Sequence, residues 1–168
     1  MMLLLTFFIK LKDNMKECIF CKIAEKKIDS AIVYEDKEFI AILDSYPNTE
    51  GMTLVLTKKH YGSYVFDLPE KVYIKLLLVS KKVSKILEKG LNVKKVSMVF
   101  EGQGVNHIHT KLYPMHKIND SKFGELLGGV YFKKYPGYIT TLVGPFQDIK
   151  KREKTIKKIK KNLNTKKQ

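Results

Sequence analysis

The sequence has few of the features that mark secreted, disulfide-bonded or membrane proteins. Its 168 residues include two cysteines and no tryptophan, and the length is that of about one domain. Two cysteines cannot build a disulfide framework. The Cys-x-x-Cys spacing of Cys18 and Cys21 is instead typical of metal or redox chemistry in a reducing compartment. No apolar run approaches the roughly eighteen residues that a transmembrane helix needs, so we expect a cytoplasmic protein with no membrane partner.

An apolar run from Met1 to Ile9 opens the sequence. It lacks the basic flank and the small-residue cleavage site of a signal peptide, and it is too short to cross a bilayer. We therefore expect residues 1–16 to form a leader or an extra strand outside the main domain.

Arginine is almost absent, although the chain is strongly basic. Lys and Arg together number 32 against 17 acidic residues, a net charge of +15, yet Arg152 is the only arginine. A dedicated nucleic-acid surface usually uses arginine for its bidentate grip on phosphate and guanine. Residues 146–168 hold ten basic and two acidic side chains, which is more than half of the net charge. A nucleic-acid partner is therefore not favoured, and any polyanion binding is expected of this tail first.

Hydrophobic patterns along the chain predict several strands and one long helix. Short apolar or alternating segments bounded by turn residues predict strands at residues 31–34, 39–43, 52–57, 96–100 and 106–113. Apolar residues at helical spacing predict a helix that starts at the capping-box pattern Asp67-x-x-Glu70 and ends at Gly90. This order of elements favours the α+β class with an antiparallel sheet.

The C-terminal third of the chain is expected to lie outside the main domain, which we place at residues 17–118. Residues 119–145 form an extension that is aromatic and glycine-rich from Tyr131 to Pro145, and in it residues 138–143 could form a short strand. Residues 146–168 are predicted to be a lysine-rich helical tail, because four apolar residues recur at helical spacing: Ile149, Ile156, Ile159 and Leu163. We expect truncation after Gly144 to leave the chemistry of the domain largely intact.

One predicted strand concentrates titratable side chains. On a strand spanning residues 106–113, His107, His109 and Lys111 project from the same face. A solvated polar face would explain any one of them. All three follow the turn Gly102-Gln103-Gly104, where backbone amides can approach an anion closely. The combination favours phosphate chemistry.

Residues 102–112, with the sequence GQGVNHIHTKL, resemble the signature strand of the histidine triad (HIT) family, in which three histidines alternate with apolar residues. Lys111 takes the place of the third histidine. The resemblance extends back through CIFCKI at 18–23, VYED at 33–36, AILD at 41–44 and LVLTKKH at 54–60, and it covers about residues 17 to 118. It implies an antiparallel sheet of about five strands with one long helix, and a homodimer formed through that helix and a sheet edge.

The resemblance also implies an enzyme that cleaves a nucleotide at its α-phosphate. It makes His109 the nucleophile that forms a nucleotidyl-histidine intermediate, a role that suits a largely neutral imidazole. Lys111 would stabilise the transition state electrostatically. Asp44 would accept hydrogen bonds from the ribose, or simply form a turn at a strand end, and Gln103 would contact phosphate or be solvated. The base would lie in an apolar slot whose residues could equally be plain core: Ile19, Phe20, Ile23 and Ile42.

A structural zinc is the expected cofactor. Cys18 and Cys21, together with His60 and His107, would supply the two thiolates and two imidazoles of a tetrahedral site. The zinc-containing branches of the family resemble this pattern, with the first histidine of the signature as a ligand. A pair of reduced buried thiols and a redox disulfide remain alternatives. His116 is expected to be a loop histidine without an assigned role.

The departures from the family pattern leave the substrate open. Lys111 replaces a histidine, and Phe100 and Gly104 lie where the nucleoside phosphoramidase branch has an asparagine and a serine. The leading hypothesis is a nucleotide hydrolase that acts on a dinucleoside polyphosphate or an adenylyl conjugate. The alternatives are a nucleotidyltransferase, or a catalytically weak module that binds nucleotide or polyanion.

Overall fold

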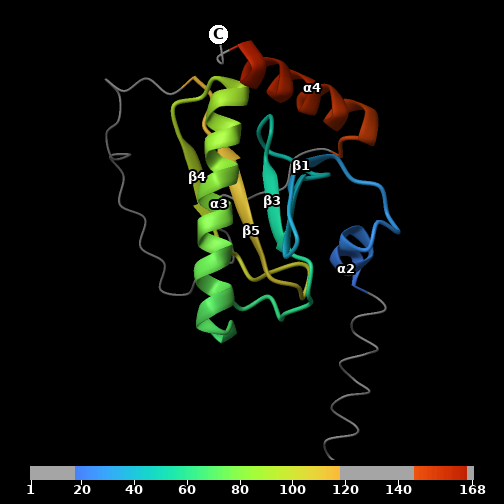
Figure 1. The fold of residues 1–168 in the computed structure, drawn as a ribbon. Coiled ribbons are helices and arrows are strands. Elements are labelled where there is room, and N and C mark those ends of the chain that lie inside the picture. Colours follow the sequence, from blue (N-terminus) through green and yellow to red (C-terminus); the bar gives the residue numbers. More distant parts are fainter. Residues whose placement is uncertain (1–17, 118–145, 166–168) are drawn as a thin grey trace, which may run out of the picture.

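The structure, a computed structural model, describes residues 18–117 and 146–165. The predicted leader, the extension at residues 119–145 and its possible strand lie outside the described residues. Five antiparallel strands form one sheet in the order β1-β2-β3-β5-β4 (Figure 1). The strands are β1 (Ile32–Glu35), β2 (Phe39–Leu43), β3 (Thr53–Thr57), β4 (Val96–Val99) and β5 (His109–Pro114). The predicted α+β fold is confirmed.

Helices cover both faces of the sheet. Along β2, Phe39 and Ala41 belong to the core formed with the long helix α3 (Glu70–Leu91), whereas Ile40 and Ile42 pack with the short helix α2 (Ile19–Ala24). Every residue of β2 and β3 is buried. Because both faces are covered, these strands have continuous apolar runs rather than an alternating pattern.

The hairpin between β1 and β2 is fixed by one aspartate. Asp36 Oδ1 accepts hydrogen bonds from the amides of Glu38 and Phe39, each at 2.8 Å. The Tyr34 hydroxyl donates to Asp36 Oδ2 at 2.7 Å. The turn thereby sets the register that carries β2 into the centre of the sheet.

Both predicted ends of α3 need correction. The predicted capping box does not form, since Asp67 ends the 3-10 turn η1 (Val65–Asp67) and Pro69 is the N-cap, without a side-chain cap. At the other end the helix passes through Gly90, and Asn92 adopts the left-handed conformation with φ 55°. Gly90 therefore does not end the helix.

The C-terminal helix α4 (Ile149–Thr165) packs against α3 at Gly90, and the predicted helical tail is confirmed (Figure 1). A Cβ at Gly90 would lie 2.9 Å from Ile159 Cα, so only glycine permits this approach. Ile159 is 2% exposed and belongs to the main core. The Asn162 side chain donates to Gly90 O at 2.7 Å. Ile159 and Leu163 of the tail thus dock on the domain.

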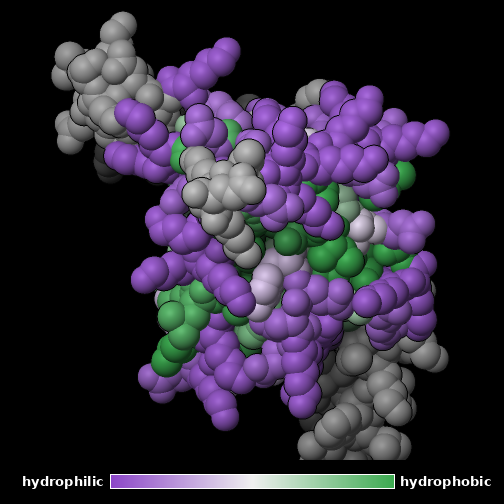
Figure 2. Space-filling model, turned by 45° about the horizontal axis from the view of Figure 1, so that its top comes forward, coloured by the Kyte–Doolittle hydropathy of each residue, from purple (hydrophilic) through white to green (hydrophobic). Residues whose placement is uncertain are grey.

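The lysines of α4 lie mostly on the surface. On the face drawn in Figure 2 hydrophilic side chains predominate, and hydrophobic ones gather in a smaller area near the middle. Among the helices that the structure describes, none combines the length and apolarity needed to cross a membrane.

Strand β5 begins three residues later than predicted. It starts at His109, where pairing with β3 begins opposite Leu56. Before it, the His107 amide donates to Val105 O at 2.7 Å, and the Ile108 amide donates to Tyr61 O at 3.0 Å. These bonds hold residues 106–108 in a tight turn against the loop after β3, outside the ladder.

Candidate functional site

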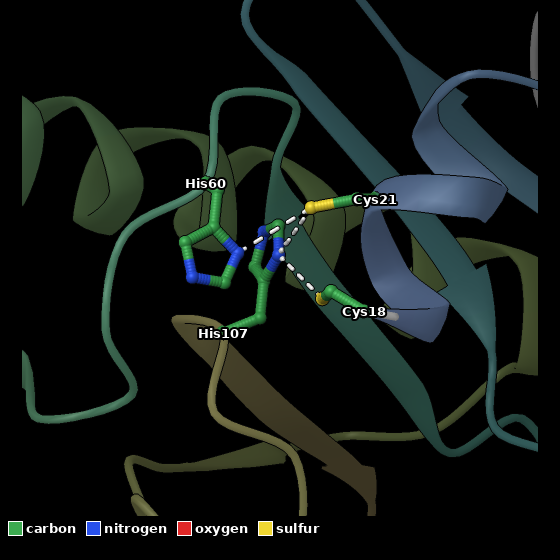
Figure 3. Close-up of side chains that lie close together, drawn as sticks. All are labelled: Cys18, Cys21, His60 and His107. Carbon is green, nitrogen blue, oxygen red and sulfur yellow. Dashed lines mark hydrogen bonds between the residues drawn. The ribbon is translucent and has the colours of Figure 1, made fainter. Parts of the chain in front are cut away.

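Two thiols and two imidazoles from distant parts of the chain converge on one point (Figure 3). Cys18 and Cys21 come from the start of α2, His60 from the loop after β3, and His107 from the turn before β5. The four candidate ligand atoms all lie within 4.8 Å of one another. The sequence predicted this set, and the structure brings all four together.

A hydrogen bond orients His107 within the cluster. The His107 Nε2 atom lies 2.8 Å from Thr57 O, and since a carbonyl can only accept, Nε2 carries the proton. The unprotonated Nδ1 then faces Cys18 Sγ at 3.4 Å and Cys21 Sγ at 3.5 Å. Burial, with the nearby His60 and His109, lowers the pKa of His107 to about 4. Its lone pair therefore stays available to a cation.

The spacing of the cluster agrees with a tetrahedral metal site. Zn–S and Zn–N bonds of about 2.3 and 2.0 Å imply sulfur-to-nitrogen distances of about 3.5 Å in a tetrahedron. Cys21 Sγ also lies 3.4 Å from His60 Nδ1. Burial, together with the hydrogen bond and charge of Cys18, raises the pKa of Cys21 to about 12. A thiol that holds its proton so strongly is a poor redox nucleophile, whereas a bound cation would favour the thiolate.

His109 is the first residue of β5 and is buried. Its Nδ1 lies 2.7 Å from His107 O and must donate the proton, so Nε2 is the unprotonated nitrogen. The ring lies edge-on to Phe20 of α2, with 5.2 Å between centroids. Burial lowers the pKa of His109. A neutral imidazole with a defined free nitrogen is the form that can act as a nucleophile.

All eight residues predicted to act in catalysis or nucleotide binding line one cavity of about 300 Å³. They are Ile19, Phe20, Ile23, Ile42, Asp44, Gln103, His109 and Lys111. The apolar members come from α2 and β2, whereas Gln103, His109 and Lys111 come from the glycine turn and β5. Asp44 directly follows β2. Apolar walls with a few converging polar groups are typical of a small-molecule site.

Asp44 combines the two roles considered for it. Its Oδ1 accepts a hydrogen bond from the Tyr46 amide at 2.8 Å, which is the turn arrangement at a strand end. Its side chain also lines the cavity. Within the described residues, Oδ2 has no hydrogen-bond partner and could accept one from a ligand.

Lys111 forms an ion pair that the sequence analysis did not predict. Its ammonium contacts Glu101 Oε2, and both side chains are mostly buried. Glu101 directly precedes the turn at Gly102 and Gly104, which have φ values of 68° and 82°. The position of Glu101 directly before this glycine turn, whose amides can approach an anion, was the sequence signal that it lies at the site.

Sequence reasoning also missed Arg152. It comes from α4, is buried and lines the same cavity. Its Nη1 donates to Leu43 O at 3.1 Å. Its singularity in a lysine-rich chain was the available signal. By contrast His116 is half-buried, does not line this cavity, and donates from Nε2 to Glu50 O at 2.9 Å.

Comparison with known proteins places this arrangement in a family. Residues 25–118 match the HIT domain. An uncharacterized HIT-like protein of Methanocaldococcus jannaschii is 36% identical over 65% of this chain and 88% of its own length. The adenosine 5′-monophosphoramidase of Saccharomyces cerevisiae is 32% identical over 66% of this chain and 68% of its own length.

A solved structure gives the same answer for the fold. A hypothetical histidine triad nucleotide-binding protein from Sulfolobus tokodaii superposes with a TM-score of 0.65 at 26% identity, covering 88% of this chain and 93% of its own. The match spans more than half of the chain and includes His107 and strand β5, which begins at His109. The chain therefore belongs to the HIT domain family.

Proposed function

We propose that this protein is a nucleotide hydrolase that acts at the α-phosphate through a nucleotidyl-His109 intermediate. The observation that carries the proposal is the orientation of His109. Its Nδ1 is held by His107 O, so Nε2 is the nitrogen that can attack, and the residue lines the cavity beside Gln103 and Gly104. Backbone amides of that turn and the Lys111 ammonium would stabilise charge on the phosphoryl oxygens.

The reaction has two steps. Nε2 of His109 attacks the α-phosphorus, and the bond to the leaving group breaks with its electron pair moving to the departing atom, which takes up a proton from solvent. Water then attacks the phosphorus of the phosphoramidate, and the P–N bond breaks with its electron pair returning to Nε2. A proton of that water passes to solvent, so that the nucleoside monophosphate and the free imidazole are released. Neither step requires His109 to begin protonated, which agrees with the lowered pKa that burial causes.

An adenylyl conjugate is the substrate class that we favour. The support is the 32% identical yeast relative, an adenosine 5′-monophosphoramidase by name. Dinucleoside polyphosphates are the second candidate, since the same nucleophile and cavity would serve both. A nucleotidyltransferase would use the same first step and differ only in the acceptor. Product analysis separates the three.

We also propose that the cluster Cys18, Cys21, His60 and His107 holds a structural zinc. The support is the four ligand atoms, the sulfur-to-nitrogen distances near 3.5 Å and the fixed tautomer of His107. The ion would join α2 to the turn before β5. It leaves His109, two residues on, free for chemistry.

A trapped intermediate tests the proposed function. The protein is mixed with adenosine 5′-phosphoramidate or diadenosine tetraphosphate, quenched, and examined by mass spectrometry and chromatography. We expect AMP as product and an adenylyl group on His109. His109→Ala should abolish turnover and still bind AMP, whereas the control His116→Ala should keep the parent rate. Turnover by His109→Ala at the parent rate would refute the mechanism.

A further inference from the structure

Arg152 is a buried cation in the cavity that the proposed reaction does not use. It is the only arginine of the chain, lies in the first turn of α4 and is 8% exposed. The same cavity is lined by Asp44 and by Ser45 and Tyr46, which follow it. A cation from α4 thus reaches the end of the site where Asp44 lies.

The guanidinium is incompletely satisfied. It has five N–H donors, and within the described residues it donates one hydrogen bond, from Nη1 to Leu43 O. Its Nε is buried without a partner in the described part of the chain. Burial lowers the pKa of Arg152, while the charges of Asp44 and Asp148 act against this shift. Neither carboxylate forms an ion pair of 4 Å or less with it. Such a group favours an added acceptor.

The packing of α4 keeps Arg152 in this place. Ile159 packs on Gly90 of α3, and the Gln147 amide donates to Ser45 O at 2.8 Å. Lys158 pairs with Glu50 at 2.8 Å. These contacts lie on both sides of Arg152 in sequence. Because they hold α4 against the domain, they also fix the position of Arg152 in the cavity.

The charges around the site restrict what can lie between Arg152 and Asp44. A group that contacts both must accept from a guanidinium and donate to a carboxylate. A hydroxyl does both at once, because it has one donor and two acceptor sites. A phosphate dianion would accept from Arg152 but would be repelled by Asp44.

We propose that Arg152 and Asp44 together hold a ribose hydroxyl, so that α4 supplies a specificity-determining residue for ribonucleotides. The hydroxyl donates to Asp44 Oδ2 and accepts from Arg152. This inference rests on the proposed nucleotide function. It differs from the expectation that truncation after Gly144 leaves the chemistry largely intact, since that truncation would remove Arg152 from the cavity.

Binding of three nucleotides to the full chain tests the proposal. AMP, 2′-deoxy-AMP and 3′-deoxy-AMP are titrated calorimetrically into the parent protein, Arg152→Met, Arg152→Lys and the control Lys154→Met, an exposed lysine of the same helix. We expect the parent to bind AMP about tenfold or more tighter than at least one deoxynucleotide, the effect of one charge-assisted hydrogen bond. Arg152→Met should lose that preference, Arg152→Lys should keep part of it, and Lys154→Met should match the parent.

The outcomes separate this inference from the function on which it rests. A parent protein that binds none of the three nucleotides would overturn both. A parent that binds AMP but shows no preference for ribose would overturn only the role of Arg152. The same holds if either arginine variant, shown to be folded by thermal unfolding, keeps the full preference. Loss of the preference in these variants supports the assignment.

Discussion

Lys111 lies on the same side of the sheet as His109 and is held by Glu101. The pair reduces the net charge of the site, but it also fixes the ammonium close to His109, the proposed nucleophile. An ammonium fixed in place can stabilise a phosphoryl transition state without reorganisation. In the proposed mechanism Glu101 is therefore a positioning residue for Lys111.

Removing the Lys111 ammonium should lower kcat/KM far more than removing the charge of its partner, Glu101. We expect Lys111→Ala to lower kcat/KM about a hundredfold or more, as for the loss of one oxyanion-hole donor. Lys111→Arg should recover part of the loss. Glu101→Gln should lower kcat/KM less than Lys111→Ala does, because the Lys111 ammonium remains. Steady-state kinetics on the confirmed substrate gives these values.

A matched control is Lys75→Ala, which removes a lysine that pairs with Glu38 on the surface, outside this cavity. It should leave kcat/KM unchanged. If Lys111→Ala turns over substrate at the parent rate, Lys111 is a structural residue and the backbone amides suffice.

At the residue scale the sequence predicted positions that a local pattern determines. Period-two alternation placed His109 and Lys111 on one face, and the structure brings both to the cavity. Spacing alone did not predict the contributions of Glu101 and Arg152, because Glu101 reaches Lys111 from a turn and Arg152 reaches the cavity through docking of α4. The turn at residues 106–108, in place of the predicted strand, likewise depends on a contact distant in sequence, because the Ile108 amide donates to Tyr61 O.

Among the elements, α3 and α4 meet at one glycine. A Cβ at Gly90 would lie 2.4 Å from Ile159 Cγ2 and 2.9 Å from its Cα, so the helices must separate to admit it. Alanine gains about 1 kcal/mol in helix propensity, while overpacking costs about 1–3 kcal/mol. Because the Cβ would meet the backbone of Ile159 rather than a flexible side chain, we expect the overpacking cost to exceed the gain in helix propensity.

Gly90→Ala should therefore destabilise the protein and loosen α4, with weaker AMP binding as a second effect through Arg152. Urea unfolding of Gly90→Ala, Ile159→Ala and the double variant measures the coupling. We expect Gly90→Ala to cost less when Ile159 is already truncated. Equal costs in both backgrounds would show that the two helices do not constrain each other here.

The ends of elements were the least predictable part of the fold. Asp67 and Glu70 have capping-box spacing, yet the helix begins after Pro69, whose carbonyl accepts from the Val72 and Tyr73 amides. Gly90 is the residue type that commonly ends a helix, yet α3 continues through it, and the close contact with Ile159 explains why a glycine lies there. In both cases the residue pattern is present, but tertiary packing rather than the local pattern determines where the helix begins and ends.

For the molecule as a whole, the metal cluster and the cavity share helix α2. Cys21 belongs to the cluster, and Phe20 and Ile23 of the same helix line the cavity. Binding of an ion would thus stabilise the fold and shape the apolar wall of the site together.

Loss of the metal should lower both stability and nucleotide affinity. We expect about one zinc per chain by elemental analysis, as the four-ligand rule implies. In Cys21→Ser or after chelation we expect Tm to fall by at least about 5 °C, which for a chain of this length corresponds to roughly 1.3–2.5 kcal/mol. AMP binding should weaken as well. His116→Ala, a histidine outside the cluster, should keep the metal and the parent Tm. Metal-free protein that is folded and fully active would refute the zinc assignment.

The homodimer remains a prediction at this scale. Strand β4 is an edge of the sheet, and its Met98 is 45% exposed. Leu78 of α3 is also exposed. The helix and the edge strand thus offer apolar surface where the family resemblance implies pairing.

The boundary of the family match and the boundary of the cavity do not coincide. The match ends at residue 118, whereas one wall residue, Arg152, comes from a helix beyond it. Strand β5, which carries His109, and helix α4, which carries Arg152, therefore line one cavity from inside and outside the matched segment. If Arg152 selects the sugar as proposed, a change in α4 would alter that selectivity and leave the signature strand intact. A comparison confined to residues 25–118 would not detect such a change.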